Sequence, residues 1–193
     1  EAGDPFASVE LLRIADDKAQ ALFDNCFEIV SGPDAPDMTI QELDKELILM
    51  LSNENPLSNN FQEGYKVFDP GTPSLHTDGT PLDTTDRSYV FEGYLLYQSA
   101  DATLGPDELN SPDRARLISQ CDIQNEVEQI VNYTFDPIIQ LGVPTLMVNG
   151  ENEGIRHSFQ IQNDAFAQGD NRLVNYKRYY FMAIAYGYNE YEP

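Results

Sequence analysis

The chain has 193 residues and a formal net charge of −22, from 33 acidic against 11 basic residues. This charge makes nucleic acids and anionic membrane surfaces poor partners, because their phosphates would be repelled. No stretch approaches the ~20 consecutive apolar residues of a membrane-spanning helix, so we expect no membrane insertion. The length allows one elaborated domain, or one domain with a small appendage.

Residues 1–31 are predicted to be an N-terminal helical segment. Within residues 6–24, apolar side chains recur at three- and four-residue steps, as in an amphipathic helix. This helix is either a cover on a sheet or the tail of a preceding domain. Residues 32–36 contain two prolines, which block helix and favour an extended entry into a first strand.

Apolar runs with turn residues on either side predict most of the remaining elements as strands. They are expected at residues 37–41, 46–51, 89–98, 115–121, 143–148, 154–161 and 177–186. Residues 127–134 are ambiguous between strand and helix, and a short helix is expected near Pro106. Short strands joined by turn-rich connections predict a mainly β, antiparallel sandwich.

Residues 52–88 are predicted to be a long loop, because Asn, Asp, Gly and Pro recur throughout them. One short strand is expected at residues 65–68. Three acidic residues late in this loop, Asp78, Asp83 and Asp86, are candidate ligands of a calcium ion, which prefers oxygen. Their spacing does not match the D-x-[DN]-x-[DN]-G loop, and the alternative is a solvated acidic loop.

The last predicted strand, residues 177–186, is apolar on both faces. Such a strand is expected to be central in its sheet and covered on both faces. One cover would be the opposing sheet. The other would be either the N-terminal helix or the inserted segments.

Three stretches together resemble fibronectin type III-like domains. They are the Pro-rich entry at residues 32–36, the F-x-G-Y-x-x-Y pattern from Phe91 to Tyr97, and the Y-x-x-x-x-x-A-Y pattern from Tyr179 to Tyr186. These residues also resemble the large surface proteins that Bacteroidota export by type IX secretion. The resemblance implies an immunoglobulin-like sandwich over residues 32–193, with insertions at 52–88 and 122–150.

Two departures from the family's pattern carry expectations of their own. The chain has no Trp, so Leu47, Leu49 and Leu51 are expected to fill the space of the family's core tryptophan. The seven residues after Tyr186 are too few for an ordinary seventh strand. We therefore expect the last strand to be rudimentary, missing or supplied by another chain, which would leave an open sheet edge beside residues 177–186.

No sequence motif for catalysis is present, and we expect no enzymatic activity and no catalytic residues. His157 lies in an alternating run and is predicted to be a strand residue. Cys26 and Cys121 fit no zinc or redox spacing, so they form either one long-range disulfide or two buried thiols. The many tyrosines serve either the core or a platform on which sugars stack.

The sequence thus predicts a non-enzymatic extracellular domain of a larger bacterial cell-surface or secreted protein. Its role would be structural, in adhesion or assembly, with other protein chains as partners by strand addition. The alternative is a carbohydrate-binding accessory module of a secreted hydrolase, with a glycan as its ligand.

Overall fold

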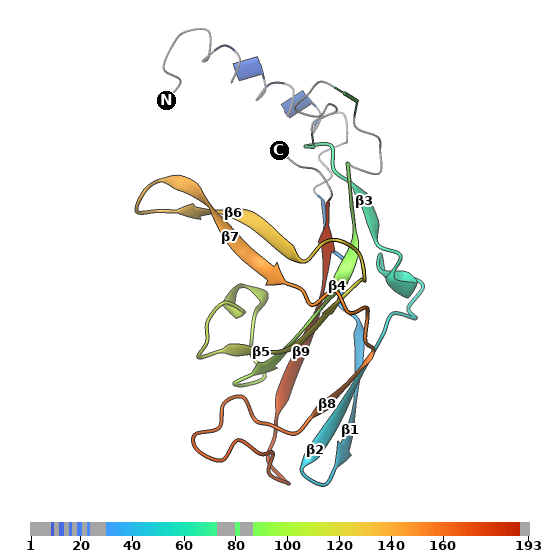
Figure 1. The fold of residues 1–193 in the computed structure, drawn as a ribbon, viewed down its shortest axis with the longest axis vertical. Helices are drawn as coiled ribbons and strands as arrows, with labels where there is room; N and C mark the ends of the chain where they lie inside the picture. The colour runs from blue at the N-terminus through green and yellow to red at the C-terminus, as the bar shows by residue number, and fades with distance from the viewer. Residues whose placement is uncertain are drawn as a thin grey trace.

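The computed structural model describes residues 30–72, 80–81 and 87–189, together with single positions between residues 9 and 23. The described residues form strands β1 to β9 and two short 3-10 helices (Figure 1). The helix predicted for residues 6–24 falls mostly outside the described residues. In the part of the chain that is described, no helix is long and apolar enough to cross a membrane.

The first sheet is antiparallel, in the order β1-β2-β8. Its strands are β1 (Asp37–Leu43), β2 (Glu46–Ser52) and β8 (Ser158–Ile161). The predicted pair of adjacent strands early in the chain is therefore confirmed. Ile40 of β1 pairs with Leu49 of β2, which pairs in turn with Phe159 of β8. Directly paired residues lie on the same face of a sheet, so these three side chains face the core.

The second sheet is built around β4 (Ser88–Ser99). One edge of β4 pairs with β9 (Tyr180–Tyr188), and its other edge pairs with β3 (Lys66–Phe68) and then β5 (Ala115–Asp122). The strands predicted at residues 65–68, 89–98 and 115–121 are confirmed.

The prediction that the last strand is central is wrong for the described residues. There β9 has a single strand partner, β4, and it is β4 that lies between neighbours. The apolar pattern of β9 is set by the covers on its two faces. It contains no information about backbone pairing at its edges, and so the pattern fits an edge strand equally well.

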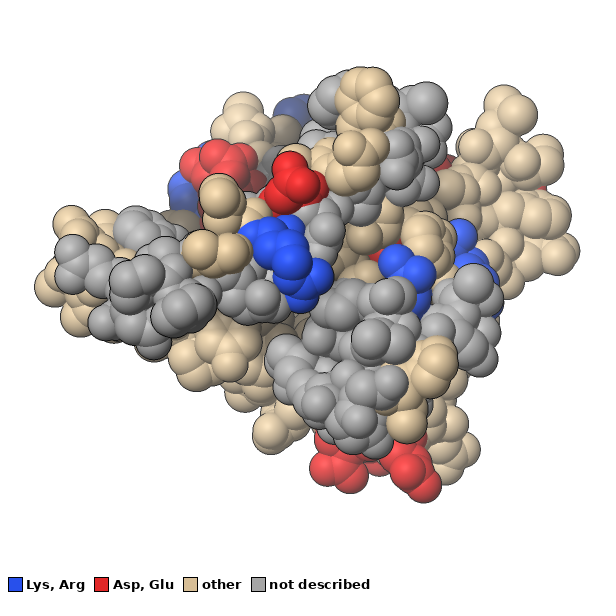
Figure 2. All heavy atoms as spheres, turned by 90° about the horizontal axis from the view of Figure 1, so that it is seen from above, with Lys and Arg blue, Asp and Glu red and all other residues tan. Residues whose placement is uncertain are grey.

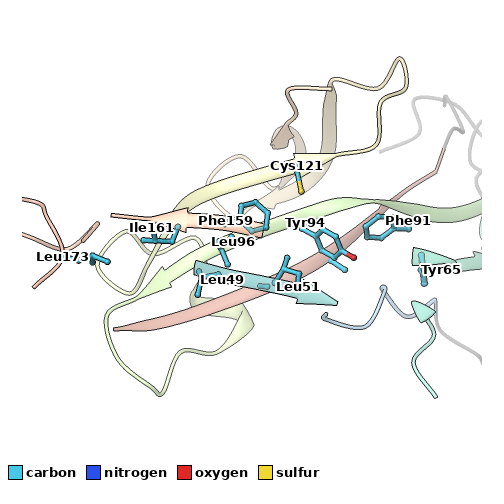
Figure 3. Packing of buried hydrophobic residues seen from close by; sticks show 12 residues of the cluster. Leu49, Leu51, Tyr65, Phe91, Tyr94, Leu96, Cys121, Phe159, Ile161 and Leu173 are labelled. Carbon is cyan, nitrogen blue, oxygen red and sulfur yellow. The ribbon is translucent and has the colours of Figure 1, made fainter. Parts of the chain in front are cut away.

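The core lies between the two sheets (Figure 3). Leu49 and Leu51 of β2 point toward Tyr94 and Leu96 of β4, and Leu49, Tyr94 and Leu96 have no exposed surface. Leu47 packs against the same cluster. The expectation that these leucines fill the core of a chain without Trp is confirmed.

The outer face of the second sheet is approached by a hairpin of β6 (Gln129–Asp136) and β7 (Leu141–Asn149). Its base shares a cleft with Leu95 of β4 and Ile184 of β9. The hairpin base therefore lies beside the second face of β9, while the other predicted cover, the N-terminal helix, falls mostly outside the described residues. The ambiguous residues 127–134 belong mostly to β6, because their apolar side chains pair across to β7.

The two remaining elements are short. The 3-10 helix η1 (Phe61–Glu63) lies in the predicted long loop, and η2 (Pro106–Glu108) confirms the short helix expected near Pro106. The structure around η1 positions Glu63 at one end of the core, as described below.

Candidate functional site

One side of the sandwich is hollowed between β1 and β9. The hollow, called here the β1–β9 slot, has a volume of about 720 Å³. Its apolar lining includes Ile40, Leu43 and Leu47 from the β1–β2 hairpin, and Leu173 and Phe181 from the chain that enters β9. The slot therefore lies between the edge strands of the two sheets.

The core is uncovered along the slot. Ile40 is on the core face of β1, yet 42% of its surface is exposed, whereas its cross-strand partner Leu49 is 0% exposed. No described strand pairs with the outer edge of β9, so the second sheet offers no strand to cover Ile40. Among the described residues, none covers this part of the core face of β1 fully.

One end of the slot is polar and closed. The Asn175 side chain donates to the Asp44 carboxylate at 2.7 Å and accepts the backbone N–H of Lys45 at 2.8 Å. These bonds tie the segment ahead of β9 to the β1–β2 turn.

Charged side chains of both signs gather at this closed end. Lys45, Lys177 and Arg178 line the slot together with the acids Glu42, Asp44 and Glu46. Lys177 is paired with Asp164 at 2.5 Å, and neither Lys45 nor Arg178 forms an ion pair with a described residue. Two cations are thus available to an acidic group of a partner.

The edge of β9 carries none of the features that protect a sheet edge. Natural edge strands are usually short, charged, bulged or interrupted by proline. From Tyr180 to Tyr188, β9 contains no charged residue and no proline. Its one irregularity lies on the side that pairs with β4, near Phe91 and Gly93.

A second cleft lies on the other face of the second sheet. Its volume is about 900 Å³, and four half-buried tyrosines line it: Tyr89, Tyr97, Tyr186 and Tyr188. The hairpin base and residues 69–72 complete its walls. Burial raises the pKa of Tyr97, and burial with the nearby acids Asp122 and Glu92 raises the pKa of Tyr186.

Two buried acids lie where the hairpin leaves the sandwich. Glu92 and Asp122 are each 2% exposed. The Asn125 side chain donates to both Glu92 carboxylate oxygens, at 2.9 and 3.0 Å, and the backbone N–H of Asn152 donates to Asp122 at 2.9 Å. Gly150 leaves no room for a Cβ beside the Asp122 carboxylate.

Burial raises the pKa of Glu92 to about 7, and the nearby charge of Asp122 adds to this, while the Asn125 bond acts against it. Such a carboxyl changes its charge near neutral pH. Its bonds join β4 to the hairpin base, so its role in the described structure is to fix the position of the hairpin.

A polar cluster lies at the edge of the core around the buried Tyr94 hydroxyl. The buried Tyr94 hydroxyl donates to Glu63 at 2.8 Å, and His157 Nε2 lies 2.6 Å from the same carboxylate oxygen. The side chain of Asn53 donates to Tyr94 as well. Gln62 and Glu63 both have positive φ, a strained backbone that these bonds hold in place. The cluster anchors the long loop to the core.

The predicted site residues have different outcomes. Asp78, Asp83 and Asp86 lie outside the described residues, as does Cys26, so calcium binding and the disulfide stay predictions. Cys121 is buried at the core, with its thiol toward the backbone oxygen of Arg156. Within the described ranges, no three His, Cys, Asp or Glu side chains are grouped as a metal ion would need.

The prediction for His157 was only partly right. The residue precedes β8 by one position and is exposed beside Glu63, because β8 begins at Ser158. Sequence reasoning also missed Glu92 and Glu63. Glu92 has a signal in the sequence, since it is a lone acid inside an apolar strand and is followed by Gly93. Glu63 has none, because its neighbours come from distant segments.

The comparisons with known proteins add no identification. The chain matches no family model, no curated protein and no solved structure.

Proposed function

We propose that this chain is a non-enzymatic, fibronectin type III-like domain that takes part in assembly by accepting a β-strand from another polypeptide. The carrying observation is the uncovered core beside β9, where Ile40 is half exposed next to a fully buried Leu49. An added strand would bond to the edge of β9 beside the slot, with which no described strand pairs, and would cover the slot.

The order of the strands supports the resemblance to the fibronectin type III and immunoglobulin-like sandwiches. The β1-β2-β8 sheet has the order expected of strands A, B and E, while β4 and β9 take the places of strands C and F. The remaining place beside F belongs to strand G. In this chain that place is the outer edge of β9.

The partner's chemistry follows from the slot. Its strand should carry apolar side chains at alternate positions, to meet the apolar walls of β1 and β9. It should carry an acidic group near the closed end, where neither Lys45 nor Arg178 forms an ion pair with a described residue. We also propose that the domain is secreted or displayed at the cell surface by type IX secretion. This part of the proposal rests on the sequence resemblance alone.

The test is the binding of a short synthetic peptide that alternates valine and threonine and ends in aspartate. We expect the peptide to slow amide hydrogen exchange at alternate residues of β9. The control is the same peptide with N-methyl groups on alternate amides, which cannot donate to β9 and should leave exchange unchanged. The proposal fails if β9 amides facing outward are already protected in the free chain, or if both peptides act alike.

A second candidate function is glycan binding in the cleft of Tyr89, Tyr97, Tyr186 and Tyr188. The observation that favours it is the grouping of four half-buried tyrosines beside residues 69–72, since aromatic rings stack on apolar sugar faces. A glycan array with the whole chain tests it. Binding that disappears in Tyr97→Ala supports a glycan site, and an array without hits removes this candidate.

A further inference from the structure

The β6–β7 hairpin, residues 129–149, has a surface unlike the rest of this acidic chain. Asp136 is its single charged residue. Its large apolar side chains are strongly exposed: Val131, Tyr133, Ile138, Ile139, Leu141, Leu146 and Met147. In the view from above, the described atoms at the far left, where the hairpin ends, are tan and so belong to none of Lys, Arg, Asp or Glu (Figure 2). Contiguous apolar surface of this kind marks a place where another protein binds.

The hairpin also lacks partners for its backbone. No described strand pairs with the outer edge of β6 or of β7. A two-stranded hairpin is marginal by itself in water and needs a further strand or a packing surface. The base has such a surface in the cleft with Leu95 and Ile184, and the outer half projects away from the sandwich (Figure 1).

The two outer edges of the hairpin are not equivalent. Pro144 interrupts the row of donors on β7, because proline has no backbone N–H. β6 contains no proline and has eight residues, close to the nine of β9. Of the two strands, β6 is thus the one able to extend another sheet.

The hairpin of a molecule cannot fill the slot of the same molecule. Its tip projects to the left in the upper half of Figure 1, whereas the β1–β2 turn, which bounds the slot, lies at the bottom. Contact between the two features therefore requires a second molecule.

We infer that the partner of the β1–β9 slot is a second copy of this chain, whose β6 adds antiparallel to β9. The inference rests on the proposed function and names the strand that the slot accepts. Antiparallel addition sets the end of β6 against the start of β9. Asp136, the hairpin's one charge, then meets Lys45 and Arg178, neither of which forms an ion pair with a described residue.

Charge supports a second copy as the partner. Copies with a net charge of −22 repel each other, so association needs surfaces without excess negative charge. The hairpin, with its single charge, and the closed end of the slot, where three bases balance three acids, are two such surfaces. Because they are different patches, each copy uses its hairpin on one neighbour and its slot on another, which gives a head-to-tail series.

The experiment measures self-association by sedimentation velocity over a range of chain concentrations. The slot variant is Lys45→Glu with Arg178→Glu, and the hairpin variant is Asp136→Lys. We expect each variant by itself to associate about tenfold or more weakly than the wild type, because each sets like charges together. An equimolar mixture should recover association, since both of its contacts are again between opposite charges.

A second hairpin variant, Asp136→Asn, controls for the chance that Asp136→Lys unfolds the hairpin turn. Asp136 Oδ1 accepts the N–H of Ile138 at 2.7 Å, and asparagine keeps this acceptor while it removes the charge. It should weaken association less than Asp136→Lys does. Circular dichroism confirms that each variant is folded.

Three results overturn the inference. The slot variant associates as the wild type does, which would mean contact between hairpins; the mixture fails to recover association; or the wild type stays monomeric at its solubility limit. In each case the synthetic peptide that alternates valine and threonine tells the two proposals apart. If it still protects β9, the slot accepts strands from a different protein and the proposed function stands.

Discussion

The two sides of the sandwich differ in how well the core is covered. On the β5–β8 side, the Arg156 guanidinium donates to the Gln120 backbone oxygen at 2.7 Å and lies over the ring of Phe159, which is 5% exposed. On the β1–β9 side, the matching core residue Ile40 is half exposed beside the slot. Phe159 and Ile40 flank the same buried Leu49 in one sheet.

The difference shows that the open side is not a general weakness of the fold. The same sheet is sealed at one edge by the Arg156 contacts, whereas at the other edge the Asn175 bonds hold only the β1–β2 turn and Ile40 stays half exposed. A core that needed only more stability would gain from closing both sides, so we interpret the open side as a surface kept for a partner.

The largest expected effect is the loss of stability when one core residue on each side is truncated. Phe159→Ala should lower the free energy of unfolding by about 3–5 kcal/mol, because it leaves a cavity in a sealed core. Ile40→Ala should lower it by about 1 kcal/mol, because half of the side chain is already in water. Urea unfolding of the free chain measures both. Equal losses would contradict the assignment of β1 to an open side.

Binding of a strand should change the stability effect of one of these two substitutions and not of the other. When the synthetic peptide occupies the slot, Ile40 becomes buried and the cost of Ile40→Ala should rise, whereas that of Phe159→Ala should stay constant. A cost for Ile40→Ala that does not change with bound peptide would show that the peptide lies elsewhere.

The next effect concerns the sealed part of the molecule and depends on pH. The pKa of Glu92 is raised to about 7 in the folded chain from an ordinary value of 4.5. Between these values the folded state holds a proton that the unfolded state has lost, so stability falls as pH rises through this window. The loss amounts to about 3 kcal/mol and is complete above pH ~7.

Glu92→Gln should remove this dependence. We expect its melting temperature, compared with that of the wild type, to gain most above neutral pH and least near pH ~4, where Glu92 is protonated in both states. Glu54→Gln is the matched control, since it removes one charge from an exposed position. A Glu54→Gln curve that flattens as much as the Glu92→Gln curve would assign the effect to net charge alone.

The smallest effect compares two arginines. Arg156→Ala should lower the free energy of unfolding by about 0.5–1 kcal/mol, through loss of its contact with the Phe159 ring. Arg178→Ala, at the slot, should change it by less than ~0.5 kcal/mol, because no described ion pair is lost. A larger loss for Arg178→Ala than for Arg156→Ala would contradict the assignment of Arg156 as the residue that seals its side of the core.

Much of the fold could be predicted from local patterns. The alternating run before Leu43 and the apolar run after Glu46 indicated two adjacent strands, because period and turn residues are local properties. The core position of the leucines of β2 was predicted instead from the resemblance, because the chain has no Trp for that space. The resemblance to a fibronectin-like domain led to the expectation of an open edge beside the last strand, and β9 has no described partner there.

The rest depends on contacts between distant residues. Residues 127–134 are ambiguous in the sequence because they have no strict period, so only their pairing with β7 decides between strand and helix. The closed end of the slot joins Lys45 to Arg178, which lie far apart in the sequence. The burial of Glu92 depends on Asn125, again from another segment.

The bonds of Asn175 to Asp44 and Lys45 have a consequence for how a strand would be seated. A strand of apolar residues can slide along a uniform edge, because neighbouring registers two residues apart offer nearly the same contacts. Here one end of the slot is blocked, because the Asn175 side chain bonds to the Asp44 carboxylate at 2.7 Å and to the Lys45 N–H at 2.8 Å. An incoming strand would stop against it, so one asparagine would decide which side chains meet.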